Sequence, residues 1–397
     1  MSDAPTSCDA PTSIELFAGG GGMALGTRGA GFRHLALVEW HRPAAEILRH
    51  NARLHPHLWS EDLVHEEDVR QWLEKTDLKV GDVDLVAGGP PCQPFSLGGV
   101  HAGDEDERNM FPAALDAVRK LRPKFVIFEN VPGLTRPSFA PYFRYIKRQL
   151  EKPTVTVDGD ELWTEHDARI QKARPRSLRY VVREHLLDTA DFGLPQTRRR
   201  VFLIAVRSDL PAAHTFPENI DGDHSRDALL YDQWVSGDYW AEHGLPMPEQ
   251  PDGVELRVRQ LKEDGRPGKG RWQTIRDAVH GLPEPIDGVD AASPANHRGI
   301  PGARVYPKHS GSSFDWPAKT IKAGVHGVSG GEAMIRFEDG SLRYLTVRES
   351  ARIQGFPDEY VFPVARSRAM GAIGNAVASP LARMLAERLR ATAGNEF

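Results

Sequence analysis

The chain has 397 residues, of which 40% are hydrophobic and 26% charged, and a formal net charge of −5. This composition is typical of an ordinary globular protein, and the length is sufficient for two domains. The polar N-terminus lacks the pattern of a signal peptide, and no apolar run is long enough to span a membrane. Because Cys8 and Cys92 are the two cysteines, a disulfide framework and a cysteine-built metal site are excluded, and a cytoplasmic protein without a metal is expected.

The N-terminal part of the chain has the pattern of a ligand-binding turn. Residues 1–12 are rich in Ser, Pro and Asp and are expected to form a flexible leader. Residues 13–17 predict a strand that runs into a glycine-rich turn at 18–22 and then a helix, an order that lets the backbone approach a nucleotide-like ligand. A second strand ends in Glu39, an acid suited to holding ribose hydroxyls. These features fit a nicotinamide cofactor as well as S-adenosylmethionine.

A cysteine follows the strand predicted at 82–86, in the sequence Gly-Gly-Pro-Pro-Cys that ends at Cys92. Ligands bind beyond the carboxyl ends of strands in open α/β sheets. A thiol at this point is a candidate nucleophile, because cysteine is highly reactive near neutral pH once its pKa is lowered. The alternative is a buried structural cysteine. The prolines on either side stiffen the backbone around the thiol and favour the reactive role.

Further candidates follow along the chain. Residues 93–109 are too polar to pack as core and predict a mobile lid, followed by a helix from about 110 to 121. A strand at 124–128 then ends at Glu129, on the same sheet edge as Cys92. This carboxylate is either solvated or a second catalytic group. Residues 137–180 are basic and irregular, which indicates a solvated face or a phosphate contact.

The second half of the chain changes in character. Three arginines, 198–200, directly precede an apolar strand at 201–206, which is unusual for surface residues. Regular periodicity fades from 211 to 318, which predicts a second, irregular domain. Four basic residues in this region either contact phosphate or lie in a disordered basic loop: Lys262, Arg266, Lys269 and Arg271. Beyond it, Thr346 and Glu349 form a capping box that predicts a helix.

Taken together, these stretches resemble the DNA (cytosine-5)-methyltransferases of bacterial restriction-modification type. The motifs, in the family's order, are Phe-x-Gly-x-Gly at 17–21, Pro-Pro-Cys-Gln at 90–93, Glu-Asn-Val at 129–131, Gln-x-Arg-x-Arg at 196–200 and Gly-Asn-x-Val at 374–377. The resemblance implies an α/β fold, a doubly wound, Rossmann-like S-adenosylmethionine-dependent methyltransferase domain with a smaller irregular target-recognition domain. The implied division is a leader at 1–12, a catalytic segment at 13–210, target recognition at 211–318, and a return segment at 319–397 that completes the catalytic domain.

The resemblance also implies roles for individual residues. Cys92 would add to C6 of a cytosine flipped out of double-stranded DNA, while Glu129 acts at N3. Arg200 would contact O2, and Arg198 belongs to the same catalytic set. Phe17 would pack on the adenine of S-adenosyl-L-methionine, which Asp68 would also contact. The full set of implied cofactor contacts is Phe17, Ala18, Gly19, Gly21, Glu39, Trp40, Asp68, Val69, Pro90, Asn375 and Val377.

Three rival functions remain at this point. A tRNA cytosine-5-methyltransferase would use the same catalytic residues, but sequence readout of DNA better explains the long region at 211–318. In a nicotinamide oxidoreductase, Cys92 and Glu129 would have no role together. A non-catalytic DNA-binding relative would not need these two residues either. A monomer in the cytoplasm, associated with the nucleoid and not with a membrane, is expected. The recognition sequence, and whether a cognate restriction endonuclease acts on the same site, stay open.

Overall fold

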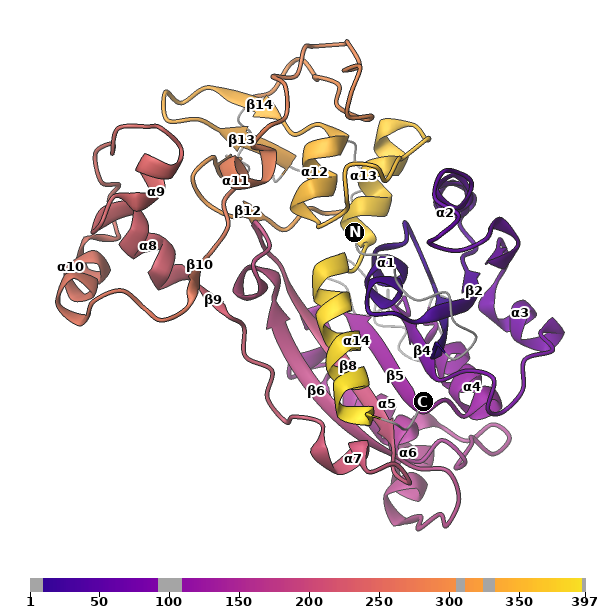
Figure 1. Ribbon diagram of the computed structural model, residues 1–397. Helices are drawn as coiled ribbons and strands as arrows, with labels where there is room; N and C mark the ends of the chain where they lie inside the picture. The colour runs from indigo at the N-terminus through magenta and orange to yellow at the C-terminus, as the bar shows by residue number, and fades with distance from the viewer. Residues whose placement is uncertain (1–9, 92–108, 305–310, 324–332, 395–397) are drawn as a thin grey trace. The chain divides into compact units, whose positions relative to one another are not determined.

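The computed structural model describes residues 10–91, 109–304, 311–323 and 333–394 (Figure 1). They divide into two compact units. The first consists of the chain up to Leu187, Arg199–Asn219 and the residues from Tyr360 onward, and the second of Asp188–Arg198 and Ile220–Glu359. Most of the expected leader lies outside the described residues, and the first strand already begins at Thr12.

One large sheet organises the first unit. Among the described residues it has seven strands in the order β3-β2-β1-β4-β5-β8-β6. Their bounds are β1 (Thr12–Leu16), β2 (Arg33–Val38), β3 (Val64–His65), β4 (Leu85–Gly88), β5 (Phe125–Asn130), β6 (Tyr180–Asp188) and β8 (Arg199–Arg207). Neighbours from β3 to β5 pair in parallel, whereas β8 is antiparallel to β5. The strand order reverses at β1, so the carboxyl ends of β1 and β4 border the usual ligand crevice of such sheets.

Helices cover both faces of this sheet. They are α1 (Gly22–Gly29), α2 (Arg42–Leu54), α3 (Val69–Lys75), α4 (Phe111–Leu121), α5 (Ala140–Glu151), α6 (Trp163–Lys172), α7 (Ala212–Thr215), α13 (Arg366–Asn375) and α14 (Ser379–Ala393). A single apolar cluster joins one sheet face to α3–α6, through residues such as Val126 on β5 and Leu115 on α4. Helix α14 packs against α1 and crosses the near face of the sheet in Figure 1. The α/β prediction is therefore confirmed.

The glycine-rich turn and α1 are packed tightly against the C-terminal residues of the first unit. A Cβ atom on Gly22 would lie 2.1 Å from the Val377 carbonyl oxygen, and one on Gly26 would lie 2.5 Å from the Ala382 Cβ. The Tyr360 hydroxyl donates to the Gly20 carbonyl oxygen over 3.0 Å. Two segments that are more than 300 residues apart in the sequence thus pack together at the glycine-rich turn.

Replacing Gly22 with alanine is expected to destabilise the protein, because the new methyl group meets a backbone carbonyl that cannot move without shifting the start of α14. Overpacking of this kind costs about 1–3 kcal/mol or more. Gly29→Ala is the matched control on the same helix, since its Cβ would meet the flexible Arg383 side chain at 3.2 Å. Urea unfolding measures both variants. Equal stability of Gly22→Ala and Gly29→Ala would contradict the close packing.

A buried polar cluster lies beneath the glycine-rich turn. Glu15 on β1 accepts a hydrogen bond from the Thr27 hydroxyl over 2.6 Å, and it is fully buried. Burial raises the pKa of Glu15 to about 8. The neighbouring His34 ring bonds the Ser13 hydroxyl and the Ala24 carbonyl oxygen, and burial lowers its pKa to about 4. At neutral pH both groups are therefore uncharged in the folded protein.

Glu15→Gln is expected to flatten the pH dependence of stability between pH 6.5 and 8. In this window Glu15 is ionised when unfolded, with an ordinary pKa of 4.5, but keeps its proton when folded. Folding then takes up a proton, so Glu15 lowers the stability of the parent by up to about 1.4 kcal/mol per pH unit as the pH rises, and by about half of that near pH 8, where the folded group is half ionised. His34, whose pKa falls from 6.5 to about 4 on folding, contributes a slope of the opposite sign at the lower end of the window, and the parent and the variant share this slope. Urea unfolding across the window gives the two slopes, and identical slopes would refute the assignment.

The second unit is built from short elements. They are β7 (Gln196–Thr197), β9 (His224–Ser225), α8 (Arg226–Trp234), α9 (Asp238–Glu242), α10 (Glu255–Asp264), β10 (Gly270–Arg271), α11 (Ile275–Val279), β11 (Ser312–Ser313), β12 (Ala318–Lys319), β13 (Met334–Arg336), β14 (Leu342–Tyr344) and α12 (Val347–Ile353). The predicted capping box is confirmed: the Thr346 hydroxyl accepts from the Glu349 N–H, and the Glu349 carboxylate accepts from the Thr346 N–H.

The structure differs from the sequence analysis in several places. Asp188–Arg198 lies in the second unit, whereas the sequence analysis placed it in the catalytic segment at 13–210. Residues 137–180, expected to be irregular, contain α5 and α6, whose apolar sides join the main core. The chain also re-enters the first unit at Tyr360, whereas the sequence analysis placed the return at 319. The reason is that the short strands beyond 311 pair within the second unit: β12 binds β7, and β11 binds β13.

Candidate active site

The turn between β1 and α1 has an unusual backbone. Phe17 has a positive φ of 55°, and Gly19 and Gly21 have φ values of 55° and 88°. The turn is closed by hydrogen bonds from the Gly21 N–H to the Ala18 oxygen and from the Ala18 N–H to the Val38 oxygen. A positive φ is costly for a side chain as large as that of Phe17 and occurs most often at functional sites. The motif residues Phe17, Ala18, Gly19 and Gly21 are therefore brought together.

Glu39 ties the second strand to this turn. One carboxylate oxygen accepts from the Gly19 N–H and the other from the His41 N–H, both over 2.7 Å. Burial raises the pKa of Glu39, although these backbone N–H groups oppose the shift. Each oxygen has a second lone pair, so the carboxylate can still accept from ligand hydroxyls. The side chain of the adjacent Trp40 is 71% exposed.

The end of β4 leads into the Gly-Gly-Pro-Pro turn, and the structure shows how its last described residues are held. The Asn130 side chain donates to the Pro90 carbonyl oxygen over 2.7 Å, and the Met110 N–H donates to the Pro91 oxygen over 3.0 Å. The chain thus leaves this point at Pro91 and returns beside it. Cys92 and the predicted lid at 93–109 lie outside the described residues up to position 108.

Glu129 and Arg200 meet at the same edge of the sheet. They extend from the paired strands β5 and β8, and the Arg200 Nε lies 2.9 Å from a Glu129 carboxylate oxygen. The Glu129 side chain is 9% exposed and that of Arg200 14% exposed. A Cβ at Gly89 would lie 3.4 Å from the Glu129 carboxylate, so the acid lies directly beside the turn that precedes Cys92. An acid and a cation therefore lie side by side at this edge of the sheet, where both side chains could contact the same planar ligand.

Arg198 lies elsewhere in the fold. It belongs to the second unit, it is 1% exposed, and its Nη1 donates to the Ile321 carbonyl oxygen. Gln196 of the same motif is also fully buried in that unit. The first unit resumes at Arg199. One sequence motif therefore contributes residues to two units.

The remaining predicted contacts have local roles as well. Asp68 caps α3 and pairs with Arg70, whose hydrogen bonds lower the pKa of the carboxyl. The Val69 side chain is buried in the main core. Val377 lies against Gly22, and Asn375 is the exposed last residue of α13.

Sequence reasoning missed two residues that hold this site. Asn130 fixes the Pro90 carbonyl, and its place directly after Glu129 in the quoted motif was the available signal. Tyr360 anchors the glycine-rich turn through Gly20, and no local pattern around it predicts this contact.

A doubly wound sheet with a glycine-rich turn after β1 and an acid after β2 is typical of enzymes that bind nucleotide cofactors, and the Glu129–Arg200 pair adds an acid and a cation at the carboxyl end of the same sheet. The comparison with known families specifies the class. The family model of the C-5 cytosine-specific DNA methylases matches residues 12–157 and 169–391. The chain belongs to this family, and it is a DNA cytosine-5-methyltransferase of bacterial restriction-modification type.

Two individual relatives of this chain are both type II methyltransferases. The chain is 30% identical to the type II methyltransferase M.NgoMIV of Neisseria gonorrhoeae, over 95% of this chain and 96% of the relative. It is 27% identical to M.NaeI of Lentzea aerocolonigenes, over 96% and 75%. Among solved structures, a putative DNA modification methyltransferase from an E. coli prophage matches with a TM-score of 0.53 at 21% identity, covering 96% and 99% of the two chains. The S. pombe Dnmt2 methyltransferase matches with a TM-score of 0.54 at 18% identity, with the same coverage. These two likenesses show the fold.

Among the described residues, no helix is long and apolar enough to cross a bilayer. Within the same ranges, no group of three or more His, Cys, Asp or Glu side chains is arranged to hold a metal ion.

Proposed function

We propose that the protein methylates C5 of a cytosine flipped out of double-stranded DNA, through a transient covalent bond between Cys92 and C6 of the base. The observation that supports this most directly is the Glu129–Arg200 pair beside the turn that leads to Cys92. Flipping is required because C6 cannot be reached while the base is stacked in the duplex.

The chemistry assigns each residue a role. Cytosine C5 is a poor nucleophile until a thiolate adds to C6 and turns the ring into an enamine. The Cys92 sulfur forms the bond to C6, while Glu129 delivers a proton to N3 and prevents charge from accumulating on the ring. Arg200, held by Glu129, interacts with O2 of the same ring. Once C5 carries the methyl group, loss of the C5 proton and elimination across C5–C6 release the Cys92 thiolate.

The residues around the first turn fit S-adenosyl-L-methionine, which supplies an electrophilic methyl group on a sulfonium. Space lies beside Gly19 in the turn at 17–21, because a Cβ there would have only the Phe17 carbonyl oxygen near it, at 3.9 Å, and Glu39 retains acceptor capacity for ribose hydroxyls. The exposed Trp40 and the partly buried Phe17 offer aromatic surface to an adenine. Asp68, Val69, Pro90, Asn375 and Val377 complete the proposed set.

Glu39→Ala is expected to weaken S-adenosyl-L-methionine binding, because the ribose and the Gly19 N–H both lose their acceptor. A loss of about 1–3 kcal/mol corresponds to one good charged hydrogen bond. Titration calorimetry measures the affinity. Glu129→Gln is the control, because it changes a proposed catalytic side chain at the end of β5 and leaves the first turn intact. Equal weakening in both variants would refute the separation of cofactor binding from chemistry.

Target recognition is assigned to the second unit, residues 188–198 and 220–359, in place of the range 211–318 inferred from sequence. The chemistry at cytosine C5 is the same at every target, whereas discrimination between sites needs side chains that reach base edges. Replacing residues 220–359 with the corresponding region of a relative should therefore transfer sequence preference.

Bisulfite sequencing of plasmid DNA tests the proposal. Cells without their own cytosine methylation would express the chain or its Cys92→Ser variant. The parent should protect cytosines in one recurring sequence context, and the variant should protect none. Unprotected plasmid together with protected cytosines in tRNA would favour the tRNA methyltransferase instead. Protection by the Cys92→Ser variant would refute the covalent route.

A further inference from the structure

The Gln196 and Arg198 side chains together hold both backbone polar groups of one residue of the second unit, Ile321. The Ile321 N–H donates to the Gln196 side-chain oxygen over 2.9 Å, and the Ile321 carbonyl accepts from Arg198 over 3.2 Å. The Gln196 amide nitrogen donates to the Gln354 side-chain oxygen over 2.7 Å, and both glutamines are fully buried. Backbone pairing of β7 with β12 extends the contact. A buried amide with such partners fixes its neighbours closely.

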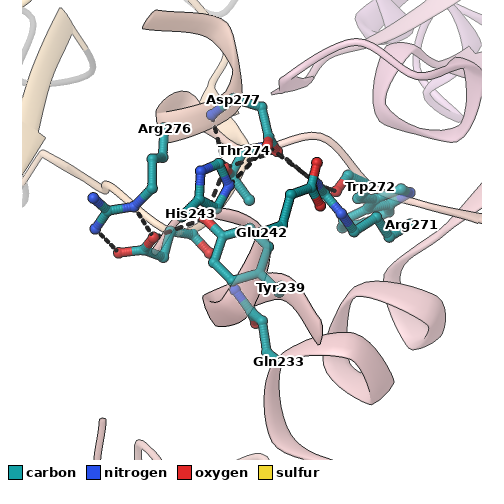
Figure 2. A network of polar contacts seen from close by, with 10 residues as sticks. Gln233, Tyr239, Glu242, His243, Arg271, Trp272, Thr274, Arg276 and Asp277 are labelled. Carbon is teal, nitrogen blue, oxygen red and sulfur yellow. Dashed lines mark hydrogen bonds and ion pairs between the residues drawn. The ribbon is translucent and has the colours of Figure 1, made fainter. Parts of the chain in front are cut away.

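The other end of the same segment is fixed by a network of charged and aromatic residues (Figure 2). Asp315 receives two hydrogen bonds from Arg276 and one from the Tyr239 hydroxyl. The Gln233 amide donates to the Asp315 carbonyl oxygen over 2.7 Å. Residues 315–321 are therefore tied to helices α8, α9 and α11 at one end and to β7 at the other.

Most arginines near this network are already paired. Arg266 binds Asp232 through two hydrogen bonds, and Arg271 binds Asp277 and Glu242. Arg257 binds Asp227 in the same way. Two of the basic residues that the sequence suggested for phosphate contact, Arg266 and Arg271, are thus neutralised by neighbouring carboxylates.

Two exposed cations near the fixed segment differ from these. Lys319 on β12 and Arg336 on β13 have no ion-pair partner among the described residues. Arg336 is the register partner of the exposed Ser313 on β11, so both side chains leave the same sheet face. The Lys319 N–H donates to the Ser312 hydroxyl over 3.0 Å, which attaches β12 to the same strand. Both cations therefore border β11 on backbone that is held in place.

We propose that Lys319 and Arg336 contact DNA phosphates, and that Gln196 and Arg198 are positioning residues that hold β12 for this contact. The inference rests on the proposed function, because it takes double-stranded DNA as the substrate. Phosphate contacts set the register of a protein on the duplex without reading bases. Arg198 then acts through Ile321 and not on the cytosine ring, unlike the catalytic role that the motif implied.

The salt dependence of DNA binding tests the phosphate contacts. Fluorescence anisotropy with a labelled duplex of arbitrary sequence would be recorded over a series of KCl concentrations, using the full chain. Lys319→Gln and Arg336→Gln should each reduce the slope of log K against log salt by about one. Lys79→Gln is the matched control. Lys79 is an exposed lysine that precedes β4, on the side of the sheet where the parallel strands begin, whereas the candidate site lies where they end. Slopes equal to those of the parent and the control would overturn the proposal.

A double-mutant cycle tests the positioning role. In the Gln196→Met background, Lys319→Gln should weaken DNA binding by a smaller factor than in the parent, because the lysine is no longer held near the phosphate. Arg198→Lys provides the same comparison if Gln196→Met does not fold. Tyr180→Phe controls for stability, since it removes a buried hydrogen bond to the Pro123 oxygen in the first unit. In that background the full Lys319→Gln effect should remain.

The outcomes separate the two proposals. The same Lys319→Gln factor in every background would leave Gln196 with a purely structural role and overturn the positioning claim. If the parent methylates DNA but its salt slope is unaffected by either cation, the inference fails while the proposed function stands. If the parent neither binds nor methylates DNA, both fail.

Discussion

Replacing Cys92 with serine is expected to abolish methyl transfer and to leave S-adenosyl-L-methionine binding intact. A hydroxyl is far harder to ionise than a thiol, whose ordinary pKa is about 8.5, so addition to C6 loses its nucleophile. The rate should fall by several orders of magnitude in single-turnover assays with radiolabelled methyl donor. DNA carrying 5-fluorocytosine should trap the parent covalently, because fluorine cannot leave C5 as a proton does.

Cys8→Ser is the natural control, since it removes the other cysteine of the chain. It should retain both the rate and the trapped adduct. Turnover by Cys92→Ser within about tenfold of the parent, equivalent to about 1.4 kcal/mol of barrier, would be too fast for a mechanism that depends on this thiol.

The second large effect is expected at the Glu129–Arg200 pair. Glu129→Gln removes the proton donor to N3, and loss of a positioned acid lowers rates by about 10²–10⁴-fold. Arg200→Lys replaces a guanidinium that reaches Glu129 over 2.9 Å with a group of different shape, and should lower the rate by about 10²–10³-fold. Because the two side chains touch, the double variant should lose less than the product of the single losses.

Single-turnover rates measure these losses, and calorimetry checks that cofactor affinity is retained. Arg199→Lys is the matched control, an exposed arginine next to Arg200 whose carbonyl oxygen accepts from Arg200. The control should keep the parent rate, because only its side chain changes. Strictly multiplicative losses for Glu129→Gln and Arg200→Lys would mean that the two residues do not act on one ring.

The parts of this fold that depend on local pattern were predictable from the sequence. The apolar run before Glu129 became β5, and the Thr346–Glu349 capping box began α12, because each signal lies within a few residues. Helix α5 was missed although Tyr142, Phe143 and Ile146 face the core, since the charged residues between them obscured the helical period.

The contacts that divide the Gln-x-Arg-x-Arg motif could not be predicted. Gln196 binds Ile321 and Gln354, more than 120 residues away, and strands of two or three residues such as β7 and β12 leave no periodic signal. The return of the chain at Tyr360 depends on the same distant pairing. Patterns in a single sequence describe local structure, whereas the partners of Gln196 and the point at which the chain returns are determined by tertiary contacts.

The division of the first unit along the chain has a consequence for synthesis. Residues 220–359 must be translated before Tyr360 can reach Gly20, a delay of roughly 7–30 s at the usual speed of about 5–20 residues per second. During that time the side of α1 bearing Gly22 and Gly26 has no partner from α14, whereas the second unit is complete as soon as Glu359 emerges. A newly made chain therefore completes its second unit before the glycine-rich turn of the first unit is closed, and a ribosome that stalls after residue 359 leaves a product with a whole second unit and an unfinished first unit.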